Sequence, residues 1–180
     1  MSPRRRRALT YGAAGVTAAA AGVWAGVRLL AGGAEPEPDQ RASALEAVAY
    51  PDLSGKPRRI VEWRGKVVAV NFWATWCAPC LEEIPMFQEV RRKHASQGFE
   101  IVGIAVDDVD KVAEFSRKLD ISYPILVADG SGLALIRQLG NSSGGLPYTA
   151  FLDRAGRPTR SKLGTFTRPE LDAFLAELLP

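Results

Sequence analysis

The residues best suited to chemistry in this chain are two cysteines separated by two residues. Cys77 and Cys80 are the only cysteines among 180 residues, and they lie in the sequence Trp-Cys-Ala-Pro-Cys. This spacing allows the two sulfurs to bond across one helical turn. A thiolate is a nucleophile toward disulfides and also a ligand for soft metal ions. The pair therefore predicts dithiol–disulfide chemistry, with metal binding as an alternative.

The elements expected around the cysteines favour the redox interpretation. Residues 66–73 form a near-continuous apolar run typical of a buried strand, and a helical pattern follows over residues 78–97. Cys77 then lies at a helix N-terminus, where unpaired N–H groups and the helix dipole stabilise a thiolate. Pro79 fits the first turn, where its missing N–H costs nothing. We predict that Cys77 attacks the disulfide of a client protein and that Cys80 resolves the mixed disulfide.

Other uses of a Cys-x-x-Cys pair are less well supported. Zinc needs about four ligands, and His94 is the only other soft ligand candidate. A static disulfide that closes so short a loop contributes little stability. A peroxidase would carry its cysteine in a different local motif. A copper chaperone remains the alternative, because two thiolates suit Cu(I); we expect no resident cofactor or metal.

Two tryptophans flank the cysteines in the sequence. Trp73 ends the predicted strand, and Trp76 directly precedes Cys77. Aromatic side chains supply large apolar contact areas in binding sites. We expect both indoles to form an apolar platform for a substrate peptide.

The rest of the chain alternates between strand and helix patterns and predicts one domain over residues 45–180. The expected strands are residues 66–73, 99–106, 123–128, 148–153 and 159–164. The expected helices are residues 78–97, 109–119, 131–139 and 168–179. Strand–helix–strand alternation followed by a hairpin and a last helix indicates an α/β three-layer sandwich, with a mixed central sheet flanked by helices. Thr167 is the expected N-cap of the last helix, and Asp107, Asp108 and Asp110 are attributed to the N-terminus of the second.

Residues 1–34 have the composition of a signal or anchor segment. Arg4–Arg7 precede an uncharged stretch over residues 8–27, which is long enough to cross a bilayer as a helix. We expect a cell-membrane anchor with the domain on the periplasmic or extracytoplasmic side. Cleavage near Ala34 and release into the periplasm is the alternative. Residues 35–44, which begin Glu-Pro-Glu-Pro-Asp, predict an extended linker.

The leader also accounts for the net positive charge. The whole chain carries 23 basic and 20 acidic residues, and five of the arginines but none of the acids lie in residues 1–34. The domain alone is close to neutral and has no basic run for phosphate contacts. Its charge therefore argues against nucleic-acid binding.

Four sequence features point together to one family. Val70–Cys80 fits an active-site run, Glu83-Ile84-Pro85 follows it, and Gly145–Thr149 fits a loop that carries a cis proline. Residues 109–128 fit a helix–strand insertion. With these features the chain resembles the thioredoxin superfamily, and more narrowly its TlpA/ResA-like, membrane-tethered branch. The resemblance covers about residues 45–180 and implies a thioredoxin-like fold with the insertion.

The resemblance implies a role for the loop that contains Pro147. A cis peptide bond at this proline would expose the backbone of the preceding residue. Leu146 could then pair through its backbone with a substrate strand beside Cys77. An ordinary turn proline is the alternative.

The resemblance also draws attention to a carboxyl group. Ordinary thioredoxins carry a buried aspartate where this chain has Asn71, which cannot titrate. Glu83, one turn after Cys80, is the expected substitute, because a partly buried carboxyl has a raised pKa and could take the proton from Cys80. A solvated helix glutamate is the alternative, which we assign to Glu82.

The function implied by the resemblance is reduction of specific disulfides outside the cytoplasm, for example in apocytochrome c or at copper-site cysteines. Electrons would come from a transmembrane thiol carrier, and we expect the protein to be a monomer. Thiol–disulfide exchange is direction-neutral, so the client and the redox poise decide the direction.

Overall fold

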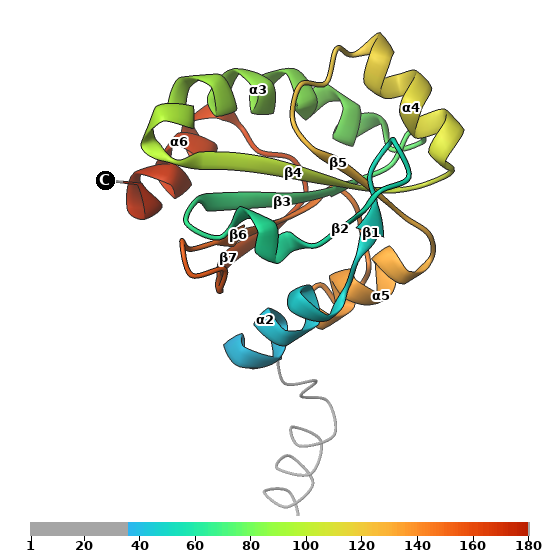
Figure 1. Ribbon diagram of the computed structural model, residues 1–180. Helices are drawn as coiled ribbons and strands as arrows, with labels where there is room; N and C mark the ends of the chain where they lie inside the picture. The colour runs from blue at the N-terminus through green and yellow to red at the C-terminus, as the bar shows by residue number, and fades with distance from the viewer. Residues whose placement is uncertain (1–35, 180) are drawn as a thin grey trace, which may run out of the picture. The chain divides into compact units, whose positions relative to one another are not determined.

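The computed structural model describes residues 36–179, which form an α/β sandwich around a five-stranded sheet (Figure 1). In the order β5-β4-β3-β6-β7, the strands are Ile125–Ala128, Phe99–Val106, Val67–Trp73, Tyr148–Leu152 and Pro158–Leu163. β3 pairs in parallel with β4 and antiparallel with β6, so the sheet is mixed, as predicted. A hairpin of β1 (Tyr50–Pro51) and β2 (Pro57–Arg58) is joined to β5 by a bridge between Asp52 and Leu126.

Helices cover both faces of the sheet, which makes three layers (Figure 1). The helices over one face are α3 (Ala78–His94), α4 (Val109–Lys118) and α6 (Arg168–Leu178). Those over the other face are α2 (Pro38–Ala47) and α5 (Ser131–Gln138). Side chains alternate along β3, so Ala69 joins the core under α3 whereas Val70 joins the core under α5. All of β3 is buried, which explains its continuous apolar sequence.

Three strand ends meet at one edge of the sheet. Trp73 pairs with Ala105 near the carboxyl ends of the parallel strands β3 and β4. Phe72 pairs with Tyr148 at the amino end of the antiparallel strand β6. The loops after β3 and β4 and the loop before β6 therefore lie at the same edge, although they are far apart in sequence.

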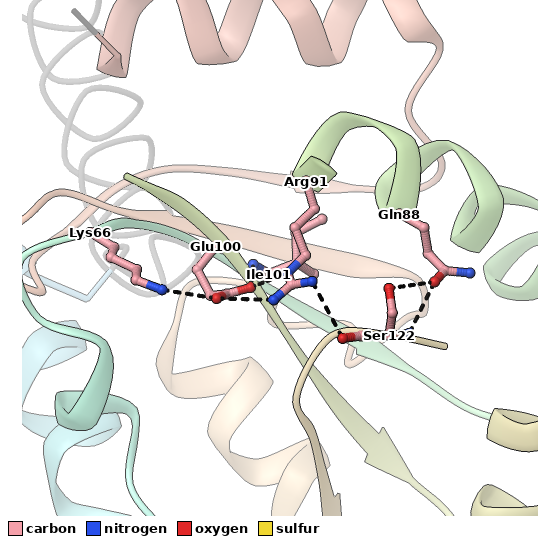
Figure 2. Close-up of polar contacts among 6 residues, drawn as sticks. All are labelled: Lys66, Gln88, Arg91, Glu100, Ile101 and Ser122. Carbon is pink, nitrogen blue, oxygen red and sulfur yellow. Dashed lines mark hydrogen bonds and ion pairs between the residues drawn. The ribbon is translucent and has the colours of Figure 1, made fainter. Parts of the chain in front are cut away.

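A polar network fastens α3 to the sheet and to the segment between α4 and β5 (Figure 2). Glu100 on β4 accepts hydrogen bonds from Lys66 Nζ at 3.0 Å and from the Arg91 guanidinium on α3. The same guanidinium donates to the Ser122 carbonyl at 3.3 Å. Gln88 Oε1, also on α3, accepts from the Ser122 N–H and hydroxyl, both at 3.0 Å. These bonds fix the position of the helix that carries the cysteines.

From residue 66 onward, the structure confirms each predicted strand and helix to within three residues at either end. The helix–strand insertion predicted over residues 109–128 is present as α4 and β5. Thr167 is the N-cap of α6, and its hydroxyl and N–H both donate to Glu170. Sequence periodicity was sufficient here because each element buries one face or both.

Within residues 36–44 the structure does not show the extended linker predicted over residues 35–44, because helix α2 begins at Pro38. Pro38 occupies the first helical position, and Gln40 Oε1 accepts from the Glu37 N–H at 3.3 Å, so the helix has a defined start. Leu45 is 1% exposed and joins the core under α5, and Ala44 packs against the same core.

The anchor predicted over residues 8–27 lies outside the described residues. Among residues 36–179, no helix combines the length and the apolar composition needed to cross a bilayer.

Candidate active site

Cys77 and Cys80 lie where β3 leads into α3. Cys77 is the N-cap of α3, and its carbonyl accepts from the N–H groups of Cys80 at 3.0 Å and Leu81 at 3.2 Å. The two sulfurs are bonded to each other, with the Cα atoms 5.3 Å apart. Cys77 keeps 6% of its surface exposed, whereas Cys80 keeps none. Only Cys77 therefore offers surface to a reactant from outside.

The loop before β6 places Leu146 and Pro147 at the same edge of the sheet. The peptide bond between them is cis, as the resemblance implied. Leu146 is half-buried and packs against the apolar cluster that includes both cysteines. The Pro147 carbonyl accepts from the Gly164 N–H at 2.8 Å, but no residue within 36–179 pairs with the N–H or carbonyl of Leu146. The backbone N–H and carbonyl of Leu146 thus have no partner within the described residues.

Glu83 points from α3 into the interior and is 4% exposed. Its Oε2 accepts from the Phe166 N–H at 3.2 Å, and its Oε1 accepts from Asn71 Nδ2 at 3.1 Å. Burial raises the pKa of Glu83 to about 7. These two hydrogen bonds and the charge of Lys162 act in the opposite direction but offset only part of the effect of burial. Glu83 is therefore not a solvated helix glutamate, whereas its neighbour Glu82 is exposed.

Asn71 connects Glu83 to the neighbouring strand. Its Nδ2 donates both to Glu83 Oε1 and to Thr149 Oγ1, the latter at 3.0 Å. Asn71 and Thr149 are fully buried and lie opposite each other in the β3–β6 register. Thr149 could not be predicted from the sequence, because its place beside Asn71 depends on that register.

The two tryptophans have opposite environments, which corrects the prediction of a shared platform. Trp76 is 68% exposed, whereas Trp73 is completely buried. Trp73 is the last residue of β3, and the alternation of side chains along the strand directs it into the core under α3. Of the two indoles, only that of Trp76 can meet a substrate peptide at the surface.

A contact that the sequence did not predict joins the loop before Cys77 to the loop after β4. Asp107 Oδ2 accepts from the N–H and the hydroxyl of Thr75, at 3.1 and 2.5 Å. Asp108 is the N-cap of α4 and accepts from the Asp110 N–H at 3.0 Å, so it has the role expected of a helix N-terminal acid. Asp107 instead reaches the neighbouring loop, because β3 and β4 are adjacent parallel strands.

The described residues offer the cysteines no further metal ligands. Within residues 36–179, no group of three or more His, Cys, Asp or Glu side chains could hold a metal ion. His94 lies at the far end of α3, about 21 Å from Cys80 along the helix axis. In this part of the chain, a metal bound by both cysteines would find no third ligand among these four residue types.

Comparisons with known proteins agree with this geometry. The model of the AhpC/TSA family matches residues 39–157. The chain belongs to this family. The thiol-disulfide oxidoreductase ResA of Bacillus cereus is 30% identical over 131 residues, covering 72% of this chain and 73% of the relative. ResA of Geobacillus thermodenitrificans is 32% identical over 130 residues, covering 72% of each.

Solved structures show the same fold for this member of the AhpC/TSA family. A thioredoxin-family thiol:disulfide interchange protein from Chlorobium tepidum TLS is 30% identical, with a TM-score of 0.64, covering 81% of this chain and 97% of that one. MTB DsbF, solved in mixed oxidised and reduced forms, is 27% identical, with a TM-score of 0.64, covering 75% of this chain and 97% of that one. With its Cys-x-x-Cys pair in a thioredoxin-like fold, the chain is a thiol–disulfide oxidoreductase.

Proposed function

We propose that this enzyme reduces disulfides of client proteins outside the cytoplasm, with Cys77 as the attacking thiol and Cys80 as the resolving thiol. The proposal is carried by the disulfide at the start of α3, in which only Cys77 has exposed surface. Relatives that are named thiol-disulfide oxidoreductases support it.

The reaction is a sequence of two exchanges. In the reduced enzyme the N-terminus of α3 favours the thiolate form of Cys77. This thiolate attacks one sulfur of the client disulfide, forms a mixed disulfide and releases the other client sulfur as a thiolate. Cys80 then loses its proton and attacks Cys77 Sγ, which releases the second client thiolate. The client gains two electrons, and the Cys77–Cys80 disulfide of the structure is the oxidised product.

Glu83 is the proposed acceptor of the proton that Cys80 loses. It follows Cys80 by three residues on α3, so the two side chains share one side of the helix. A pKa of about 7 leaves Glu83 partly ionised at neutral pH, the condition in which a general base is most effective. Asn71, which cannot titrate, holds one carboxylate oxygen in place.

Two groups are proposed to hold the client beside Cys77. The free N–H and carbonyl of Leu146 can pair with an extended client segment, in the manner of an added strand. The exposed indole of Trp76 supplies apolar contact area next to the reacting sulfur. Pro147 contributes by leaving the backbone before it unpaired.

The leader supports a location outside the cytoplasm. Arg4–Arg7 would remain on the cytoplasmic side while residues 8–27 cross the membrane as an anchor. Each turnover oxidises the dithiol, so a partner must reduce it again. We propose a transmembrane thiol carrier as this donor, and apocytochrome c or copper-site cysteines as clients of a monomeric enzyme.

The test is to trap the clients in the native host. Cys80→Ala leaves Cys77 without its resolving partner, so mixed disulfides with clients should accumulate and be identified by mass spectrometry. Cys77→Ala is the matched control and should trap none. If Cys80→Ala also traps none while the wild-type protein retains Cu(I), the chain is a copper chaperone and the reductase proposal fails.

A further inference from the structure

Two loops are fastened to each other beside the reactive cysteine. Thr75, two residues before Cys77, donates both its N–H and its hydroxyl to Asp107 Oδ2. The other carboxylate oxygen of Asp107 accepts from the Asp108 N–H at 2.8 Å. The Asp107 side chain is 6% exposed. One nearly buried carboxylate therefore fixes the loop before α3 and the loop before α4 to each other.

This fastening persists over the neutral pH range. Burial alone raises the pKa of Asp107, but hydrogen bonds from Thr75 and from the Asp108 N–H outweigh burial, and the pKa lies below its usual value. Lys111 Nζ, 3.8 Å from Asp107 Oδ1, acts in the same direction. The group that holds the loops together is thus a carboxylate whenever a thiolate could react.

Large apolar side chains are exposed next to the fastened loops. Trp76 directly follows Thr75, and Val109, the first residue of α4, is 45% exposed. Leu163 is 50% exposed and packs over Gly145, next to Leu146. Single exposed apolar residues are ordinary on a protein surface. Here, however, three of the four large ones among the described residues adjoin the loops around the cysteine pair.

We propose that the loop from Asp107 to Val109 is one wall of the client-binding surface, where Val109 and Trp76 together contact an apolar side chain close to the client's cysteine. Asp107 is the positioning residue of this wall, because it fixes the loop of Val109 against the loop of Trp76. The inference rests on the proposed function and adds to it a preference for clients with a large apolar residue beside the disulfide.

The occupant of this surface follows from the chemistry at Cys77. A client sulfur must approach Cys77 Sγ closely for exchange to occur, yet Cys77 exposes only 6% of its surface. The chain on either side of that sulfur must therefore lie across the neighbouring loops. Val109 and Trp76 are the large exposed apolar side chains of the two loops that Asp107 joins, so a disulfide-bearing segment of the client is the group that covers them.

The test compares two substrates on the same enzyme. Two synthetic disulfide peptides differ only in Leu or Ser beside the attacked cysteine, and the full-length protein, reduced and freed of reductant, is mixed with each. The measured quantity is the ratio of the two second-order rate constants, which general damage to the active site does not change. Val109→Ser should lower the preference for the leucine peptide by roughly tenfold, the lower end of the range for the loss of one apolar contact. Thr75→Val, which removes one of the two bonds to Asp107 while keeping side-chain shape, should lower it by a smaller factor.

The matched control is Leu53→Ser, which removes the remaining large exposed apolar side chain, in the segment between β1 and β2. It should leave the ratio at the wild-type value. An unchanged ratio in Val109→Ser, or an equal loss in Leu53→Ser, overturns the inference while the reductase function stands. If the wild-type protein reduces neither peptide, the proposed function itself fails.

Discussion

Glu83 and Glu100 are both almost completely buried, at 4% and 5% exposure, yet the pKa values of their carboxyl groups are shifted in opposite directions. Burial raises the pKa of each group by desolvating its charge. For Glu100, hydrogen bonds from Arg91, from Lys66 and from the Ile101 N–H outweigh burial, and the pKa is lowered (Figure 2). For Glu83, burial prevails and the pKa rises to about 7.

The two groups differ in the partners that bind their carboxylate oxygens. Glu100 binds two cations directly, whereas Glu83 receives hydrogen bonds only from neutral groups, the Asn71 amide and the Phe166 N–H. The cation that acts on Glu83 is Lys162, whose ammonium group is paired with Glu170 at 2.8 Å. Glu100, which is bound directly by cations, serves as a fixed negative charge that holds α3. Glu83, which is hydrogen-bonded only by neutral groups, can exchange a proton near pH 7.

The largest expected effect is on stability, from replacing Arg91, the main cation that binds Glu100. In Arg91→Met the buried carboxylate keeps only Lys66, which is 46% exposed, as a charged partner. We expect the free energy of unfolding to fall by about 3 kcal/mol at pH 7.5, as for other buried pairs that lose one partner. Urea denaturation of both proteins over a pH series measures this.

The pH dependence separates the loss of charge pairing from simple loss of packing. Because the pKa of Glu100 is lowered by its partners, their stabilisation is present above the unfolded-state pKa and is lost as the pH falls through the folded-state pKa. The gap between wild type and Arg91→Met should therefore shrink in acid. A gap of constant size would show that Arg91 acts by packing alone. Arg92→Met, at the exposed neighbouring position on α3, should change stability little at any pH.

The sequence was enough to predict the sandwich because its strands and helices carry strong periodic patterns. The run over residues 67–73 is buried on both faces, and Gly98, in the left-handed region at φ 79°, ends the helical segment after β3. α2 and the β1–β2 hairpin were missed. Each strand of the hairpin has only two residues, too few for an alternation to be seen, and Leu45 is the one buried residue of α2.

The cysteines and Glu83 were predicted because they are close in sequence and share one helix. The burial of Glu83 was expected from the resemblance, but its hydrogen-bond partners Asn71 and Phe166 were not, because they lie on other elements of the fold. Thr149 meets Asn71 only through the β3–β6 register, and Asp107 meets Thr75 only through the adjacency of β3 and β4. Trp73 was assigned to the surface because of its place near the cysteines, whereas the alternation along β3 buries it.

Glu83→Gln should have the next largest effect, on the rate of exchange. If Glu83 accepts the proton of Cys80, its replacement removes a general base, which typically contributes about 10²-fold. We expect the resolving step to be slower by about this factor at pH 8 and the difference to narrow below pH 6, where Glu83 is already protonated. Stopped-flow kinetics from the mixed disulfide measures this step. Glu82→Gln, at the exposed neighbouring position, is the control, and an unchanged pH–rate profile in Glu83→Gln would remove Glu83 from the mechanism.

The same variant should also change how stability depends on pH. Because the pKa of Glu83 is raised, the protonated form favours folding, and stability is lost as the pH rises from the unfolded value near 4.5 through about 7. Glu83→Gln has no such loss, so its stability relative to wild type should increase by roughly 2 kcal/mol between pH 5 and pH 8. The amide's altered hydrogen bonds add only a pH-independent offset. Denaturation of the oxidised proteins at both pH values would contradict the raised pKa if the relative stability did not change.

The smallest expected effect tests whether a distant, shared cation acts on Glu83 at all. Lys162 lowers the pKa of Glu83 less than Phe166 and Asn71 do, and its ammonium group already pairs with Glu170. In Lys162→Met, the part of the pH–rate profile that follows the ionisation of Glu83 should move to higher pH. This change in the pKa of Glu83 should be smaller than the one that burial causes. Arg160→Met, on the same strand but paired with Glu177, should leave that part of the profile in place. A shift to lower pH, or an equal shift in both variants, would contradict an effect of Lys162 on Glu83 through charge. The expected result would show that a cation that does not bond the carboxylate changes the pKa of Glu83 only slightly, whereas at Glu100 the directly bonded Arg91 and Lys66, together with the Ile101 N–H, outweigh burial.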